Sequence, residues 1–98
     1  MQYSVNLSLT AIEDIQLAVD YYNSQSAKLG LKFSDEVDNS MEAIARMPTA
    51  YSYRYKNVRA KLLYKFPFLI FFIIDEDKCT VEVLRIFNAH QDPHLIII

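Results

Sequence analysis

Residues 66–74 read FPFLIFFII, and this stretch decides the fold. It is far shorter than the roughly 20 apolar residues of a membrane-spanning helix, and it contains Pro67, which we expect in a turn or bulge. Residues 68–74 are apolar on both faces of an extended chain, which is typical of a strand in the middle of a sheet. The run DEDK at residues 75–78 then predicts a turn into a further strand over residues 80–87.

The residues before this strand follow a tyrosine-rich connection and alternate in polarity, as a half-buried strand does. The side chains expected on one face are Val58, Ala60, Leu62, Tyr64 and Phe66. The basic side chains expected on the other face are Arg59, Lys61 and Lys65. In the last strand we expect one side to carry Val81, Val83, Arg85 and Phe87.

The first half of the chain predicts a strand and two helices. Residues 2–7 alternate like a strand, and a stripe at helical spacing then comprises Ile12, Ile15, Ala18, Val19 and Tyr22. The polar cluster NSQS at residues 23–26 predicts a turn, and a second stripe comprises Phe33, Val37, Met41, Ile44 and Met47. Ser8 and Thr10 are alternative caps of the first helix, and Pro48 ends the second.

These elements predict one α+β domain over residues 1–98. It has an N-terminal strand, a helical hairpin and three consecutive strands, which form a mainly antiparallel sheet with the helices on one face. Because apolar side chains already occupy the helix side of the strand over residues 58–66, we expect its basic stripe on the open face.

Composition excludes several classes of protein. Apolar residues make up 52% of the chain and charged residues 22%, which favours a packed core over disorder. Cys79 is the only cysteine, so an internal disulfide and a cysteine-based zinc cluster are excluded. The N-terminus has no secretion signal, so a cytoplasmic location with no membrane partner is expected. Residues 1–45 carry seven acids and two bases, whereas residues 46–98 carry eight bases and five acids.

Several short strings, in their order and spacing, point to a known family. In the helical half they contain Ala11, Asp14, Ile15, Tyr21, Tyr22, Phe33, Pro48 and Tyr51. In the sheet half they contain Val58, Arg59, residues 66–72, residues 83–86, Asp92 and Pro93. Together they resemble the RelE/ParE family of toxins from type II toxin-antitoxin modules, over nearly the whole chain. The FPF string at residues 66–68 is more similar to the ParE-like branch.

The resemblance implies a bacterial growth-inhibiting toxin that a cognate antitoxin neutralises, as a homodimer or a toxin-antitoxin hetero-oligomer. In the ParE-like branch the implied target is DNA gyrase, and inhibition is by binding, without catalytic residues, metal or cofactor. In the other branch the toxin cuts ribosome-bound mRNA, and the candidates for that chemistry here are Arg59, Lys61, Arg85 and His90. A third interpretation is an inactive toxin-fold module that only binds partners.

The chain departs from both branches. Phe68 stands where the nuclease branch commonly has arginine, and no tyrosine follows Tyr64, although His90 is an alternative acid. The ParE-like branch often has the string His-Gly-x-Arg-Asp-Pro after its last strand, and here residues 88–93 read NAHQDP. These departures favour binding over RNA cleavage and leave the target open.

The residues that we expect to contact a target or the antitoxin are Arg59, Lys61, Lys65, Arg85, His90 and Gln91. Each has a simpler alternative: the basic stripe is a solvated face, Arg85 pairs with a helix acid such as Glu42, and His90 lies in a surface loop. A metal site between His90 and His94 is rejected because Pro93 separates them.

Two further groups of residues have open roles. The tyrosines at residues 51, 53 and 55 either pack at the rim of the core or stack on bases beside Arg54 and Lys56. The apolar residues 95–98 (LIII) are expected to pack on the sheet, in a dimer or under an antitoxin element.

Overall fold

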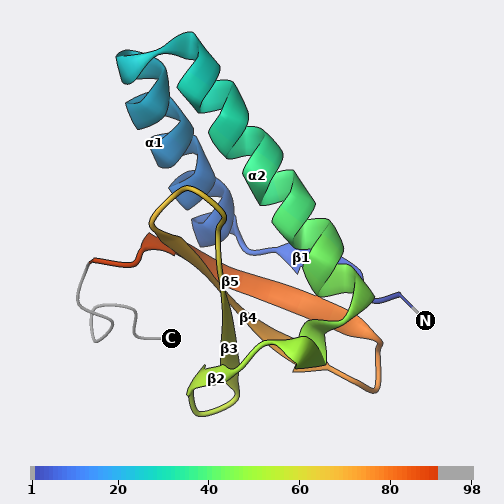
Figure 1. Ribbon diagram of the computed structural model, residues 1–98. Coiled ribbons are helices and arrows are strands. Elements are labelled where there is room, and N and C mark those ends of the chain that lie inside the picture. Colours follow the sequence, from blue (N-terminus) through green and yellow to red (C-terminus); the bar gives the residue numbers. More distant parts are fainter. Residues whose placement is uncertain (1, 91–98) are drawn as a thin grey trace.

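The computed structural model describes residues 2–90. Its elements, in chain order, are β1 (Ser4–Leu7), α1 (Leu9–Gln25), α2 (Ala27–Arg46), the 3-10 turn η1 (Pro48–Ala50), β2 (Tyr53–Tyr55), β3 (Val58–Leu62), β4 (Phe68–Asp75) and β5 (Thr80–Asn88). The two helices run side by side, and β2 lies at the opposite end of the molecule from the turn that joins them (Figure 1). No helix within residues 2–90 combines the length and apolar character needed to cross a bilayer.

The strands form one mixed sheet in the order β1-β5-β4-β3-β2. β1 pairs in parallel with β5, and the other three pairs are antiparallel. β4 lies between β5 and β3, as its two apolar faces predicted. The predicted α+β fold is therefore confirmed. The short strand β2 was not predicted, because we interpreted these residues as a connection.

Serine side chains fix the start of both helices. The Ser8 hydroxyl accepts a hydrogen bond from the Ala11 N–H at 3.0 Å, which selects Ser8 over Thr10 as the cap of α1. The predicted turn at residues 23–26 shrinks to Ser26 alone, which is extended and whose hydroxyl accepts from the Lys28 N–H at 3.2 Å. Both helices are therefore longer than their apolar stripes.

The main core lies between the helices and one face of the sheet. Its buried side chains are Ala11, Ala18, Phe33, Val37, Ile44, Leu63, Phe66, Ile70, Phe72, Val81, Val83 and Ile86. A smaller cluster on the far face of the sheet comprises Val58, Leu69 and Phe71. Both faces of β4 are thus apolar and largely buried, which explains why its sequence has no polar alternation.

The basic side chains of β3 lie on the face of the sheet opposite to the expected one. In the antiparallel pair of β3 and β4, Arg59 is opposite Phe72 and Lys61 is opposite Ile70. Residues directly opposite each other point to the same face, and Phe72 and Ile70 belong to the core beneath the helices. The prediction that these cations lie on the open face is therefore wrong.

The error has a physical reason. Alternation in β3 separates two faces but does not say which one meets the helices, because the neighbouring β4 is apolar on both. The helices pack mainly on β5 and β1, so they leave the β3 end of the sheet uncovered. Arg59 and Lys61 thus share a sheet face with the helices and are still half-exposed.

The predicted alternation also fails beyond Leu62, where β3 ends. Lys65 lies in the following loop with φ at 69°, rather than on a strand. Phe66 turns into the core beneath the helices, on the side opposite to Val58, with which we had grouped it. Pro67 lies in this loop, as predicted, and its carbonyl accepts from the Ala89 N–H at 2.7 Å.

Candidate functional site

Arg59 forms the centre of a cationic and aromatic surface. Its Nη1 donates a hydrogen bond to the Tyr51 carbonyl at 2.6 Å, and its guanidinium carbon lies 4.0 Å from the centre of the Tyr53 ring. The β2–β3 pairing places Tyr53 directly opposite Arg59, which explains this stacking. A guanidinium carries five N–H donors, so this contact orients Arg59 while leaving donors for a ligand.

Three lysines repeat the arrangement on both sides of Arg59. Lys56 Nζ lies 5.3 Å from the centre of the Tyr55 ring, and Lys61 Nζ lies 5.8 Å from that of Tyr51. Lys65 Nζ lies 5.4 Å from the ring of its neighbour Tyr64. We call these eight residues the tyrosine–cation surface: Tyr51, Tyr53, Tyr55, Lys56, Arg59, Lys61, Tyr64 and Lys65. The register shift in β2 pairs Tyr55 with Val58 of the far-face cluster, so Tyr55 lies on the opposite side of the sheet from Tyr53. The electron-rich ring faces attract the cations and hold them near the protein surface.

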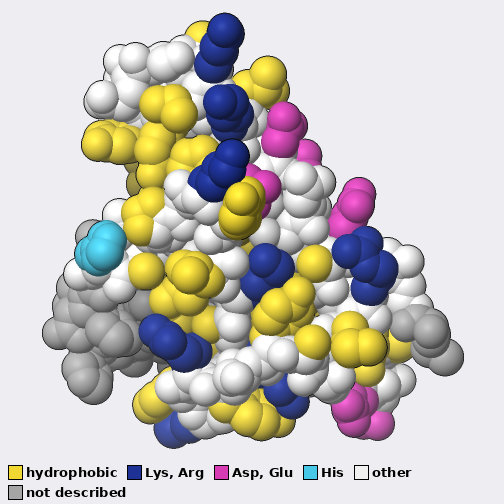
Figure 2. Space-filling model, viewed as in Figure 1, with side chains coloured by type: hydrophobic (Ala, Val, Ile, Leu, Met, Phe, Trp, Pro, Cys, Tyr) yellow, Lys and Arg dark blue, Asp and Glu magenta, His cyan; other side chains and the backbone are white. Residues whose placement is uncertain are grey.

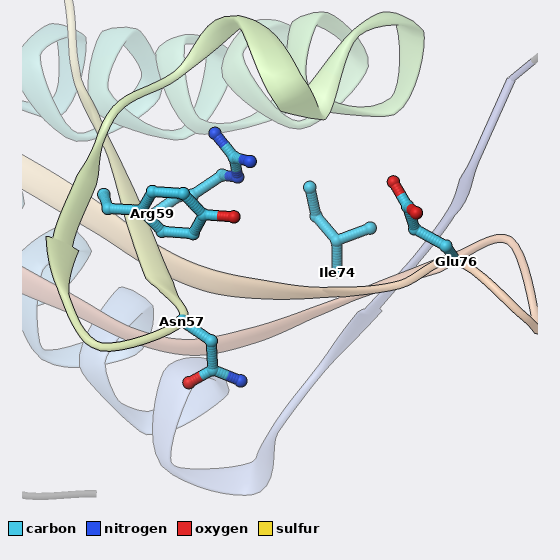
Figure 3. Close-up of a pocket in the computed structure, with 5 residues that line it drawn as sticks. Asn57, Arg59, Ile74 and Glu76 are labelled. Carbon is cyan, nitrogen blue, oxygen red and sulfur yellow. The ribbon is translucent and has the colours of Figure 1, made fainter.

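A shallow pocket of about 250 Å³ adjoins Arg59. Its lining comprises Tyr53, Asn57, Arg59, Ile74 and Glu76. Arg59, Ile74 and Glu76 project toward one side, and Asn57 points away from them (Figure 3). Glu76 is therefore the carboxylate that faces this end of the tyrosine–cation surface.

Acidic side chains do not neutralise the tyrosine–cation surface. Within residues 2–90, the one ion pair joins Arg85 to Asp14, and neither belongs to this surface. Acidic side chains lie along α2 together with basic ones, whereas over the sheet half basic and hydrophobic side chains are interleaved (Figure 2). The excess of basic residues in the second half of the sequence thus lies over the sheet.

Arg85 has a structural partner. Its Nε and Nη2 donate to the two carboxylate oxygens of Asp14 at 2.8 and 2.9 Å, and the Ile86 N–H donates to the same carboxylate at 3.1 Å. The hydrogen bond to Asp14 raises the pKa of Arg85 above its ordinary value, although burial acts against it. Pairing with a helix acid is therefore confirmed, but the acid is Asp14 rather than Glu42.

Val83 and Arg85 do not share a face of the sheet, contrary to the prediction. The register between β4 and β5 shifts, so that Phe71 pairs with Arg85 and Phe72 pairs with Val83. The shift leaves one extra residue, Leu84, on β5, and such a bulge changes which side chains share a face. Val83 accordingly enters the core beneath the helices, whereas Arg85 reaches Asp14 on α1.

The residues proposed for RNA cleavage do not gather in one place. β4 separates Arg85 on β5 from Arg59 and Lys61 on β3. His90 is exposed, and its backbone N–H donates to the Asn88 side chain at 2.9 Å. Gln91, His94 and residues 95–98 lie outside the described residues. Within residues 2–90, no group of three or more His, Cys, Asp or Glu side chains is placed to hold a metal ion.

Sequence reasoning did not choose between packing and exposure for the tyrosines of this surface. Residues 51–56 read YSYRYK, a strict alternation that is itself a strand signal, yet this stretch was interpreted as a connection. Tyr53 and Tyr55 are 59% and 58% exposed, so they are surface groups rather than core groups. A regular hairpin here would pair Tyr53 with Ala60, and only the register shift between Tyr53 and Tyr55 places Tyr53 opposite Arg59.

The comparison with protein families decides the family. Residues 5–93 match the model of the ParE toxin of type II toxin-antitoxin systems, parDE. The chain belongs to the ParE toxin family. No curated protein sequence matches it.

Solved structures agree with the ParE family assignment at the level of the fold. A toxin structure from the chromosomal ParDE system of P. aeruginosa is 17% identical with a TM-score of 0.78, and the match covers 91% of this chain and 98% of that one. The RelBE2 complex of Mycobacterium tuberculosis gives 17% identity and a TM-score of 0.64, covering 90% and 99% of the two chains. The E. coli RelBE complex gives 14% identity and 0.68, covering 91% and 99%.

Proposed function

We propose that this ParE-family toxin inhibits growth by binding a macromolecular target, DNA gyrase, through the tyrosine–cation surface. The observation that carries the proposal is that Arg59 and Lys61 are half-exposed and have no carboxylate partner within residues 2–90. Cations that a fold does not neutralise are available to an anionic partner. Lys65, in the loop before β4, is a further exposed cation with its Nζ near the Tyr64 ring.

Binding rather than covalent chemistry is favoured by the distribution of candidate groups. A nuclease needs a base, an acid and cations around one phosphate. Here Asp14 holds Arg85 away from Arg59, and Lys61 faces the ring of Tyr51. We assign Arg85 a structural role, and we keep His90 and Gln91 as candidate contacts.

A cognate antitoxin completes the proposal. Solved structures similar to this chain include a ParDE system and RelBE toxin-antitoxin complexes, which supports an antitoxin that neutralises this toxin as well. We place toxin and antitoxin in the cytoplasm, where gyrase acts.

The test separates the proposed target from the alternatives. The full chain is induced in cells, and plasmid supercoiling and protein synthesis are followed in parallel. Gyrase inhibition predicts loss of negative supercoiling before translation falls, and purified toxin should block supercoiling of relaxed plasmid by gyrase. Early arrest of translation with cut mRNA would instead indicate a ribosome-dependent endonuclease. Unimpaired growth would indicate an inactive binding module.

A further inference from the structure

The side of α1 that points away from the core carries large apolar side chains. Leu9 is 73% exposed, Ile12 50%, Leu17 69% and Tyr21 60%. A helix on the surface of a globular domain normally has polar side chains on its outer side. The longer helix α2 follows this rule, because Leu31 is the one large apolar side chain that it exposes. The outer side of α1 therefore has an unusual composition.

The four exposed side chains form a strip along α1. Residues three or four apart in a helix are neighbours on its surface, and this spacing joins Leu9 to Ile12 and Leu17 to Tyr21. Glu13 lies between the two pairs, four residues from both Leu9 and Leu17. We call Leu9, Ile12, Leu17 and Tyr21 the apolar strip of α1, and its length is about 18 Å.

The apolar strip has the character of a docking site. Hydrophobic side chains gather over the half of α1 nearest the turn between the helices (Figure 2). Single exposed apolar residues are normal on a protein surface, whereas a contiguous group of them marks a site for another molecule. The strip is therefore expected to be covered by a partner.

The charges on α1 select the kind of partner. Its charged residues are Glu13, Asp14 and Asp20, and it has no Lys or Arg. Asp14 is paired with Arg85, whereas Glu13 and Asp20 are exposed and have no cationic partner within residues 2–90. Two carboxylates that the fold does not neutralise, beside an apolar strip, attract a partner with positive charges around an apolar surface.

We infer that the apolar strip of α1 docks an amphipathic helix of another protein, with Lys or Arg side chains opposite Glu13 and Asp20. Helices that pack side by side bury apolar rows against each other and keep charged side chains at the edges of the contact. The apolar strip shares no residue with the tyrosine–cation surface. The inference therefore goes beyond the proposed function and does not depend on gyrase as the target.

The same charges argue against two other occupants. A second copy of this chain, docked through the same strip, would place the acids of one α1 against those of the other, and like charges across an interface cost affinity. An anionic membrane surface attracts helices whose polar face carries Lys and Arg, and it repels acids. A basic amphipathic helix matches both the apolar and the acidic side chains of α1.

The experiment measures the binding of labelled peptides of about 18 residues to the purified full chain by fluorescence anisotropy. The basic peptide has leucines on one face of a helix and lysines on both sides of that face. A second peptide has glutamate in place of each lysine, and a third has the composition of the basic peptide in scrambled order. We expect the basic peptide to bind at least about tenfold more tightly than either control peptide. Equal binding of the glutamate peptide would overturn the charge requirement, and equal binding of the scrambled peptide would overturn helix docking.

Substitutions test whether the peptide binds on α1. The double variant Leu17→Gln with Tyr21→Gln should weaken binding of the basic peptide about tenfold or more, because it removes two of the side chains that the peptide covers. Leu31→Gln with Met47→Gln is the matched control, since these side chains are 65% and 61% exposed and lie outside α1. The control should bind within about twofold of wild type, and thermal unfolding checks the fold of both variants. Equal binding by the two double variants would overturn the site on α1.

A charge exchange tests the two carboxylates. In the variant Glu13→Lys with Asp20→Lys, the glutamate peptide should bind about tenfold more tightly than the basic one, and an unchanged preference would overturn the role of these acids. Light scattering tests the second copy as occupant. Self-association of the wild-type chain that Leu17→Gln with Tyr21→Gln abolishes would assign the strip to a homodimer and overturn the inference.

The inference and the proposed function fail separately. The variant Leu17→Gln with Tyr21→Gln should inhibit gyrase as wild type does, because the apolar strip lies outside the tyrosine–cation surface. Loss of gyrase inhibition in this variant, with the fold intact, would overturn the separation of the two sites. A wild-type chain that binds the basic peptide and leaves gyrase active would refute the proposed target alone.

Discussion

The carboxylate of Asp14 in α1 and the guanidinium of Arg85 in β5 form a two-point ion pair, with N···O distances of 2.8 and 2.9 Å. The pair lies where the β1 side of β5 becomes a free sheet edge, because β1 pairs with β5 only as far as Val83. Beyond that point the Asp14 carboxylate also accepts from the Ile86 N–H. The Asp14 side chain thus links α1 to β5 and also accepts the hydrogen bond of a backbone N–H at the edge of β5.

Removing Asp14 is expected to destabilise the fold. Asp14→Ala leaves the Arg85 guanidinium and the Ile86 N–H without their partner, and the side chains of Arg85 and Asp14 are only 28% and 11% exposed. We expect the free energy of unfolding to fall by about 2–3 kcal/mol, measured by urea denaturation. Asp20→Ala, at an exposed position of the same helix, should change it by less than about 0.5 kcal/mol. Equal effects of the two substitutions would refute the structural role of Asp14.

Gly30 of α2 and Asn23 of α1 approach each other closely where the two helices pack. A Cβ on Gly30 would lie 1.8 Å from Asn23 Oδ1, so alanine fits only if the Asn23 side chain moves. In the Asn23→Ala background, Gly30→Ala should raise the free energy of unfolding by about 1 kcal/mol through helix propensity. In the wild-type background the gain should be smaller, because the exposed Asn23 side chain must rotate away from the new methyl group. Equal effects in both backgrounds, in a thermal or urea double-mutant cycle, would contradict the close contact.

Tyr22 makes the free energy of unfolding depend on pH in the alkaline range. Burial raises the pKa of Tyr22, and Tyr21 adds to the shift; the ring stacks on Phe33 with centres 5.3 Å apart. Above pH about 10 the phenol ionises in the unfolded chain before it does so in the folded one. The stabilising contribution is therefore complete below pH about 10 and is lost as the pH rises toward the raised pKa. Tyr22→Phe should lose less stability than wild type between about pH 8 and pH 10.5 in urea denaturation, and Tyr53→Phe, at an exposed position, is the control. An identical loss in wild type and Tyr22→Phe would refute the burial of this phenol.

The central strand and the helices were predictable because local pattern determines them. The unbroken apolar run in residues 68–74 is bounded by Pro67 and by the turn DEDK, and a short run so bounded is typical of a central strand. Ser8 could be singled out as a cap but not chosen over Thr10, since both have the required chemistry and only the Ala11 contact decides. Local signals thus located the elements to within a few residues.

The orientation of β3 was not predictable from local pattern. Period-two alternation puts Arg59 and Ala60 on different faces, but the helices choose the face by packing on distant strands. The bulge at Leu84 is also a long-range effect, since it appears only when β5 is paired with β4. The role of Arg59, Lys61 and Lys65 as contacts therefore stays a prediction, whereas the position of Arg59 and Lys61 on the helix side of the sheet was not predictable.

The structure changes the best test of the proposed binding surface. A charge reversal at Arg59 also breaks its bond to the Tyr51 carbonyl, so loss of toxicity would confound binding with folding. Lys56 is exposed at the β2–β3 turn, and Lys61 Nζ donates to the carbonyl of its neighbour Leu62 and lies near the Tyr51 ring. Their reversal changes the charge of the surface with little effect on packing.

The double variant Lys56→Glu with Lys61→Glu is therefore expected to abolish growth inhibition. It should also weaken inhibition of gyrase supercoiling about tenfold or more. The reason is that it places two negative charges on the surface that attracts an anionic partner. Lys28→Glu with Lys32→Glu is the matched control, since it makes the same change of net charge on exposed positions of α2. The control should remain toxic, and both variants should unfold within about 1 kcal/mol of wild type. If both variants lose toxicity equally, net charge rather than the tyrosine–cation surface governs inhibition. If both stay toxic, the target binds elsewhere on the molecule.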